Sequence, residues 1–283
     1  MDTITKLMSI KEIEELKNKS IYNSISYPPH TIYQIKNSEC TITAYKSGKV
    51  VFQGKELSFL DNSSPSESLN NNFPQAGSDE VGTGDYFGPI CVCACLVKQS
   101  QVEMLKDLKI SDSKAMVDSY IMQIAPKLIK ELEHSLLILD NIKYNEIHEK
   151  HNMNAIKAIL HNSAYIHLSK RVDSMPNLCV VDQFTPKNNY FKYISNEKNI
   201  FKNLHFETKA ENKYLAVACA SVIARYTFLK CFDSLTKQYG ITFLKGAGSK
   251  VDEFAQVFYD KYGLEELKKV SKFHFANTDK LIK

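Results

Sequence analysis

Four acidic residues stand at positions where a sequence that only builds a core would not place them. Asp79 and Glu80 are adjacent, Asp182 directly follows the apolar run 178–181, and Glu211 precedes an alanine-rich stretch. A carboxylate at the end of a buried strand is costly to desolvate unless a cation or hydrogen-bond donors meet it. An acid at the start of a helix is favoured by the helix dipole. The four are therefore candidates for one site.

Such a site has a defined chemistry. Converging carboxylates repel each other unless divalent metal neutralises them, and oxygen ligands without His or Cys favour Mg²⁺ or Mn²⁺ over zinc. Two such ions, about 3.5–4 Å apart, form the known arrangement for phosphodiester hydrolysis, which needs no protein nucleophile. Taken singly, each acid also has a plainer interpretation as solvated surface, a turn or a helix cap. Their patterned neighbours favour the metal site.

The elements that would position these acids are strands and helices in alternation. Segments 87–97 and 135–139 are predicted strands, and 178–181 is predicted to be a buried strand because four apolar residues follow one another. Apolar residues at spacings of three and four predict a helix over 153–164, and the alanine-rich stretch 215–232 predicts one that packs closely on a sheet. This order predicts a three-layer α/β domain.

A smaller domain is predicted ahead of it. Ser9 to Glu12 form a capping box that begins a helix with Ile10, Ile13 and Leu16 on one face. Segment 40–45 alternates as a half-buried strand, and a turn at 46–49 leads into a second strand. We therefore predict an α+β module at 1–58, a flexible linker at 59–76, which is polar and poor in packing residues, and the main domain at 77–283.

Composition sets the remaining limits. The 283 residues are 43% hydrophobic and 24% charged with a net charge of +4, which permits a nucleic-acid partner without proving one. No apolar run of about 20 residues and no secretory signal are evident. The cysteine count of seven is odd, and Cys91, Cys93 and Cys95 are predicted to be buried, reduced thiols on one strand face. A cytoplasmic protein is expected.

The segment Gly77-Ser78-Asp79-Glu80-Val81-Gly82-Thr83-Gly84-Asp85-Tyr86-Phe87-Gly88-Pro89 resembles the first motif of the type 2 ribonuclease H family, and most closely that of ribonuclease HIII. The similarity spans essentially all of 77–283. It continues at Ser111–Lys114, Asn154–Asn162, Val180–Phe184, Thr208–Lys213 and His274–Thr278.

The resemblance implies a ribonuclease H-like catalytic domain in which Asp79, Glu80, Asp182 and Glu211 hold two Mg²⁺ or Mn²⁺ ions and act as the catalytic residues. Ribonuclease HII usually carries Asp at the fourth position, so Glu211 favours the HIII type. Glu207 is a nearby competitor, but it lies in a context that resembles a strand end.

The resemblance also implies substrate contacts. Gly82, Thr83 and Gly84 would sense the 2′-hydroxyl of RNA through backbone groups, because a side chain would keep the backbone from the minor groove. Ser113 and Lys114 would contact phosphates. Arg225 and His161 are interpreted as structural residues with some prospect of substrate contact.

The N-terminal module is similar to the domain of ribonuclease HIII that resembles TATA-box-binding protein, and Lys46 and Lys49 of its hairpin would meet phosphates. The implied function is endonucleolytic cleavage of the RNA strand of RNA/DNA hybrids, leaving 5′-phosphate and 3′-hydroxyl ends. The implied partner is the hybrid, with no membrane, no protein partner and a monomeric chain. Two alternatives stay open: excision of single ribonucleotides from DNA, and a binding protein without catalysis. The four intact acids argue against the second.

Overall fold

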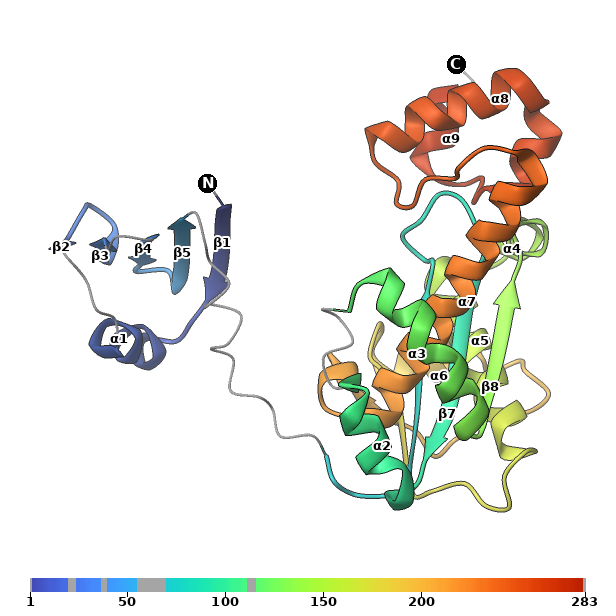
Figure 1. Ribbon diagram of the computed structural model, residues 1–283, viewed down its shortest axis with the longest axis horizontal. Coiled ribbons are helices and arrows are strands. Elements are labelled where there is room, and N and C mark those ends of the chain that lie inside the picture. Colours follow the sequence, from blue (N-terminus) through green and yellow to red (C-terminus); the bar gives the residue numbers. More distant parts are fainter. Residues whose placement is uncertain (1, 20–23, 37–39, 55–69, 111–115, 282–283) are drawn as a thin grey trace. The chain divides into compact units, whose positions relative to one another are not determined.

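The computed structural model describes residues 2–19, 24–36, 40–54, 70–110 and 116–281 (Figure 1). The chain divides into two compact units, the N-terminal unit Met1–Glu67 and the C-terminal unit Ser68–Lys283. The division falls within the segment 59–76 that the sequence assigns to a linker. The predicted phosphate contacts Ser113 and Lys114 lie outside the described residues.

The N-terminal unit is an antiparallel sheet of strand order β1-β5-β4-β3-β2 with one helix. Its elements are β1 (Asp2–Leu7), α1 (Ile10–Lys19), β2 (Ser24–Ser26), β3 (Thr31–Lys36), β4 (Cys40–Tyr45) and β5 (Lys49–Gly54). Helix α1, strands β4 and β5 and the turn between these strands agree with the sequence patterns. The patterns predicted none of β1, β2 and β3.

The start of α1 follows the predicted capping box. The Ser9 amide donates to Glu12 Oε2 at 2.7 Å, and the Glu12 amide donates to Ser9 Oγ at 3.3 Å. Ile13 is fully buried against the sheet, and its carbonyl accepts from the Tyr33 hydroxyl at 2.8 Å. Ile10 differs from the expectation, because it is 68% exposed. It takes no part in the core that buries Ile13.

The C-terminal unit is built on a mixed sheet of order β10-β9-β6-β7-β8. Strand β6 pairs in parallel with β9 and antiparallel with β7, so it lies at the centre. The sequence patterns missed β6, which begins two residues before the predicted domain start at 77. The elements are β6 (Gln75–Val81), β7 (Ile90–Val97), η2 (Gln99–Gln101), α2 (Val102–Asp107), α3 (Asp118–Glu131), β8 (His134–Leu139), α4 (Asn141–His148), α5 (Met153–Ser169), β9 (Leu178–Asp182), α6 (Lys187–Tyr193), β10 (His205–Glu207), η4 (Ala210–Asn212), α7 (Leu215–Tyr239), α8 (Ser249–Val270) and α9 (Ala276–Leu281).

Helices cover both faces of this sheet, which confirms the predicted three-layer α/β architecture (Figure 1). Helices α7 and α3 lie over one face, and α5 with α6 over the other. Alternation along β7 divides its side chains between two separate cores. Cys91, Cys93 and Cys95 lie on one face, as predicted, and all three are fully buried free thiols in the core under α7. Val92 and Ala94 point to the α5 face.

Helix α7 packs unusually close to β6 because the strand carries Gly77 at the contact. A Cβ atom on Gly77 would lie 2.3 Å from the backbone nitrogen of Val217, far inside any normal contact. By length and composition α7 also passes as a membrane span, which amends the expectation that no such run exists. However, 67% of that stretch is buried inside the protein. Its composition is that of a core helix.

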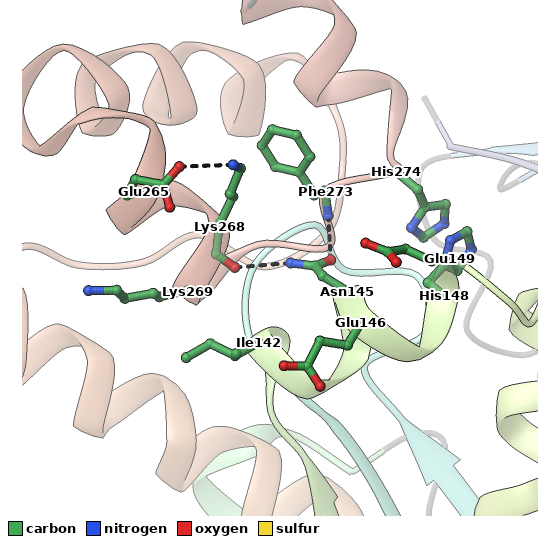
Figure 2. A pocket seen from close by; sticks show the side chains of 10 residues that line it. All are labelled: Ile142, Asn145, Glu146, His148, Glu149, Glu265, Lys268, Lys269, Phe273 and His274. Carbon is green, nitrogen blue, oxygen red and sulfur yellow. Dashed lines mark hydrogen bonds and ion pairs between the residues drawn. The ribbon is translucent and has the colours of Figure 1, made fainter.

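The last part of the chain is attached to the sheet domain through α4. Asn145 donates from Nδ2 to the Lys268 carbonyl at 3.0 Å, and its Oδ1 accepts from the Phe273 amide at 3.0 Å (Figure 2). Its Nδ2 also donates to the Ser271 carbonyl at 3.0 Å. A pocket of about 520 Å³ lies beside these contacts. None of the four candidate acids lines this pocket.

Candidate active site

Asp79 and Asp182 occupy matching places on two neighbouring parallel strands. Ser78 of β6 pairs with Val181 of β9, so the next residue of each strand is the acid. Paired residues of a sheet share a face. Asp79 points to the α7 side, because its antiparallel partner Cys93 belongs to the core under α7. The geometry of the sheet therefore brings two of the four acids side by side.

The environment of Asp79 disfavours a lone negative charge. Burial raises the pKa of the Asp79 carboxyl well above its ordinary value, and the charges of Glu80 and Asp182 raise it further. Hydrogen bonds from the Ser221 side chain and the Glu80 amide only partly oppose this rise. A group in this position gains most when a cation compensates its charge.

Glu211 is connected to Asp182 by the residue that precedes it in the chain, Ala210. Glu211 is 3% exposed and lies in η4, directly ahead of α7. The amide of Ala210 donates to Asp182 Oδ1 at 2.9 Å. Glu211 therefore directly follows the residue whose amide binds the Asp182 carboxylate.

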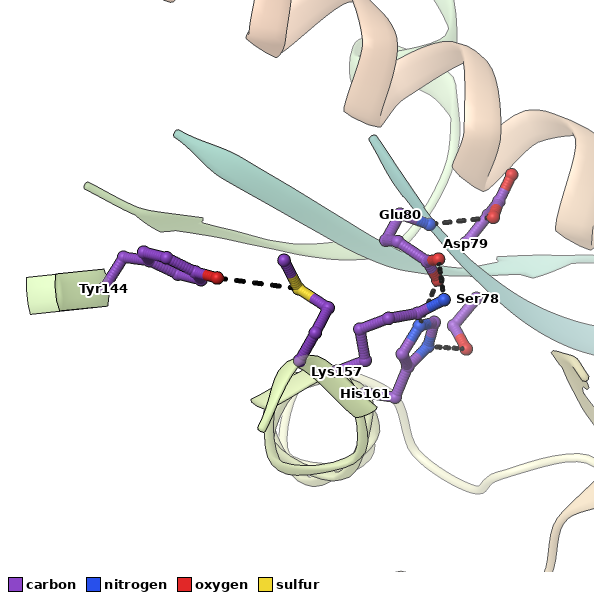
Figure 3. A network of polar contacts seen from close by, with 7 residues as sticks. Ser78, Asp79, Glu80, Tyr144, Lys157 and His161 are labelled. Atoms are coloured by element: carbon purple, nitrogen blue, oxygen red, sulfur yellow. Dashed lines mark hydrogen bonds and ion pairs between the residues drawn. The ribbon is translucent and has the colours of Figure 1, made fainter. Parts of the chain in front are cut away.

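Glu80 points to the opposite face, because adjacent residues of a strand alternate. There it meets α5 (Figure 3). His161 Nε2 lies 2.8 Å from Glu80 Oε2, and Lys157 Nζ forms an ion pair with Glu80 Oε1. The other ring nitrogen of His161 lies 2.7 Å from Ser78 Oγ. Lys157 also stands 4.0 Å from the centre of the Phe184 ring.

These partners keep Glu80 ionised although it is buried. Burial alone raises the pKa of Glu80, but the hydrogen bond and charge of His161 and the ion pair with Lys157 outweigh it, so the pKa is lowered. Both oxygens of Glu80 are thus engaged by α5. Within the described ranges, no three His, Cys, Asp or Glu side chains already stand in an arrangement that holds a metal ion. Asp79 and Asp182 share one side, where the amide of Ala210, the residue before Glu211, contacts Asp182, and Glu80 occupies the other side.

The donor set nevertheless fits a hard divalent cation. Asp79, Asp182 and Glu211 offer only carboxylate oxygens, the ligands that Mg²⁺ and Mn²⁺ prefer. Burial and mutual repulsion raise the pKa of Asp79, which is the condition that a bound cation relieves.

The glycine turn Gly82–Gly84 after β6 requires glycine at its first residue and is exposed to solvent at its last. Gly82 has a φ of +99°, and a Cβ there would lie 2.3 Å from the carbonyl oxygen of Pro89. Gly84 is exposed, and a Cβ there would meet nothing within 4 Å. Thr83 between them is half-buried. The turn therefore presents accessible backbone at Gly84 and Thr83 beside the acids at the end of β6.

Two other acid contacts fall outside this constellation. Glu207 lies on β10 opposite Asp182, but its carboxylate accepts from Lys213 Nζ at 2.8 Å. Arg225 contacts Asp118 at 2.7 Å and so ties α7 to α3, the structural role expected for it.

Sequence reasoning missed Lys157 and understated His161. The signal was their spacing of four within a helix most of whose other inward positions are apolar. Residues four apart share a helix face, so a lysine and a histidine there must find polar partners.

A sheet with acids at the adjacent ends of β6 and β9, and a third in η4 just ahead of α7, is typical of a protein of the ribonuclease H type. The model of the family described as Ribonuclease HII matches residues 76–278. A second model, Domain of unknown function (DUF3378), matches residues 3–60.

Individual relatives show which family of this class the chain belongs to. Ribonuclease HIII of Listeria monocytogenes serotype 4b is 41% identical over 96% of this chain and 95% of its own length, and ribonuclease HIII of Bacillus mycoides is 42% identical over 89% and 88%. The crystal structure of Bst-RNase HIII in complex with Mn²⁺ superposes with a TM-score of 0.72 at 33% identity, covering 99% and 98% of the two chains. The chain belongs to the ribonuclease HIII family.

Proposed function

We propose that this protein is a metal-dependent endonuclease that hydrolyses the RNA strand of RNA/DNA hybrids and leaves 5′-phosphate and 3′-hydroxyl ends. The observation that carries the proposal is the pairing of Asp79 and Asp182 at neighbouring strand ends, with Glu211 one residue from the Asp182 contact. Membership of the ribonuclease HIII family supports the same reaction.

Asp79, Glu80, Asp182 and Glu211 are proposed to hold two Mg²⁺ or Mn²⁺ ions. The Mn²⁺ complex of Bst-RNase HIII supports this choice of metal. When bound, such ions supply an activated water and stabilise the leaving oxygen. The chain's own part is orientation: the Ala210 amide fixes one oxygen of Asp182.

Glu80 is positioned from α5. Lys157 and His161 hold its carboxylate ionised, so no proton has to leave it before it binds a cation. Because its carboxylate faces α5 in the structure, its participation requires the side chain to turn toward the Asp79 side.

Recognition of the RNA strand is assigned to Gly82, Thr83 and Gly84, with Ser113 and Lys114 on phosphates. The exposed backbone at Gly84 supports this role, because a 2′-hydroxyl is a donor and acceptor that only RNA presents. The left-handed φ of Gly82 supports it as well, since the turn depends on glycine.

The N-terminal unit is proposed as a domain that grips the hybrid, at 1–58, joined by a linker at 59–76 to the catalytic domain at 77–283. Lys46 and Lys49 are exposed around the turn between β4 and β5, where phosphates can reach them. We also propose that this unit is similar to TATA-box-binding protein. We further infer a monomer that acts without a protein partner in the cytoplasm; the buried free thiols support the location alone.

The test offers the purified chain labelled RNA/DNA hybrid, RNA duplex, and DNA with one embedded ribonucleotide, each with Mg²⁺, Mn²⁺ or chelator. We expect cleavage of the hybrid with either metal and none with chelator. Cleavage confined to the single-ribonucleotide duplex would favour the ribonuclease HII-like alternative.

A matched pair of variants tests the site itself. Asp79→Asn should bind hybrid and lose nearly all cleavage, whereas Glu207→Gln, at the competing acid, should cleave normally. Near wild-type activity of Asp79→Asn would refute the metal assignment.

A further inference from the structure

Lys272 is a fully buried lysine that belongs to none of the groups considered so far. Its ammonium donates to the carbonyl oxygen of Asp85 at 2.8 Å and to that of Gly88 at 2.6 Å. Burial lowers the pKa of Lys272 to about 7, against the attraction of Asp85. Placing a lysine in such surroundings is costly, so both of its acceptors must matter to the local structure.

These acceptors belong to the segment that follows the glycine turn. Residues 270–272 form a short strand-like pairing with residues 86–88 of this segment. The Lys272 amide donates to the Tyr86 carbonyl at 2.8 Å, and the Gly88 amide donates to the Val270 carbonyl at 2.9 Å. The ammonium of Lys272 therefore reinforces a backbone pairing that already fixes this side of the turn.

Helix α4 anchors both partners of this pairing. Asn141 Nδ2 donates to the same Gly88 carbonyl as Lys272, at 2.9 Å. One turn further along the helix, Asn145 holds the carbonyl of Lys268 and the amide of Phe273 (Figure 2). It also holds the carbonyl of Ser271. The segment after the turn is thus tied to a helix of the domain core and not only to the C-terminal residues.

The glycine turn itself spans two fixed ends. Its first end continues from β6, which carries Asp79 and Glu80. Its second end is Asp85, whose carbonyl Lys272 holds and whose Oδ1 accepts from the Gly246 amide at 2.5 Å. The position of the backbone between the ends, relative to the acids, follows from how firmly Asp85 is held.

We propose that Lys272 is a positioning residue for substrate. By holding the carbonyls of Asp85 and Gly88, Lys272 fixes the position of the Gly82–Gly84 turn, so that the backbone of the turn reaches the ribose of the RNA strand. This inference rests on the proposed function, because it assigns the turn to recognition of the hybrid. Lys272 itself contacts neither the acids nor the turn glycines, so it acts through the loop.

The test replaces Lys272 with Met, which keeps the length and apolar volume but removes the donors. We expect KM for the hybrid to rise at least about tenfold, the effect of losing a charge-assisted hydrogen bond, while kcat stays within about twofold. In an Asp79→Asn background, where hybrid stays intact, the ratio of Kd for DNA duplex to Kd for hybrid should fall by a similar factor. Lys269→Met, an exposed lysine of the same segment that pairs with Glu266, is the control and should change neither value.

The outcomes separate the two proposals. If the wild-type chain does not cleave hybrid, the proposed function fails; if it does, and folded Lys272→Met keeps KM and the Kd ratio, the positioning role is overturned. Should Lys272→Met not fold, Asn141→Leu removes the other donor to the Gly88 carbonyl. A raised KM and a reduced Kd ratio in that variant support the loop-holding role, and unchanged values overturn it.

Discussion

Replacing Lys157 by Met should destabilise the C-terminal unit, because it leaves Glu80 ionised and buried with only His161 beside it. The side chains of Lys157 and Glu80 are 11% and 12% exposed, so solvent does little to replace the lost partner. Removing one member of a buried pair costs about 3–5 kcal/mol, and the remaining His161 contact places the expected loss near 3 kcal/mol. For a domain of this size the loss corresponds to a fall in Tm of about 6–12 °C.

The measurement is urea unfolding of both proteins in chelator, across pH. The pKa of Glu80 is lowered from 4.5 in the folded chain, so its ionised form contributes stability above that value, and this contribution is lost as pH falls through the folded pKa. The difference in the free energy of unfolding between wild type and Lys157→Met should therefore be full at pH 7. It should shrink below about pH 4.5, where the carboxyl of the unfolded chain takes up a proton while that of the folded chain is still ionised.

Two controls assign this effect to the pair. Lys143→Met breaks a surface contact with Glu146 that is about 60% exposed on each side, and should leave the Tm unchanged within error. In a double-mutant cycle, Glu80→Gln and Lys157→Met together should cost less than the sum of the two single changes. A loss below about 1 kcal/mol at pH 7, or one that does not diminish in acid, would contradict a buried, ionised Glu80 held by Lys157.

Three further outcomes are expected. Gly82→Ala should lower the free energy of unfolding by about 1–3 kcal/mol, because its Cβ would meet the Pro89 carbonyl at 2.3 Å, whereas Gly84→Ala should unfold as the wild type does; equal urea curves for both variants would count against the turn geometry. Removal of residues 1–58 should raise KM for hybrid more than it lowers kcat, and an unchanged KM would contradict the grip role. Mn²⁺ should raise the Tm of the wild-type chain in a concentration-dependent way and that of Asp79→Asn much less, so equal shifts in calorimetry would place the ion elsewhere.

The sequence predicted the fold class because its strongest periodic segments carry the architecture. The buried run at 178–181 became β9, and the alanine-rich stretch became α7, which extends seven residues past its predicted end at Phe232 to Tyr239. The sequence did not predict the central strand β6, although this strand holds two of the acids. Its sequence Gln75 to Val81 contains a glycine, a serine and two acids, residues that are uncommon in strands. Here tertiary constraint overrides propensity: close packing on α7 demands Gly77. The proposed metal site accounts for the two carboxylates.

Recognising β6 as a strand would have changed the picture of the acids. Adjacent residues of a strand point to opposite faces, so Asp79 and Glu80 cannot both face α7 unless the strand end twists or a side chain turns. The structure shows Asp79 toward Ser221 of α7 and Glu80 toward Lys157 of α5. The partners of Glu80 could not be predicted from local sequence, because α5 lies more than seventy residues away and only the folded sheet brings the two together.

The same alternation gives the Asp79–Glu80 pair a reason to be adjacent. Two neighbouring acids on one face would add their repulsion at the end of a single strand, whereas on opposite faces each meets its own environment. Asp79 is surrounded by burial and negative charge, which raise its pKa, while Glu80 meets a lysine and a histidine, which lower its pKa. One acid therefore gains most from an added cation and the other is already compensated by protein. If Glu80 binds the metal as proposed, a cation on the Asp79 side has to draw its carboxylate away from Lys157, and the strength of that ion pair limits the metal affinity that Glu80 contributes.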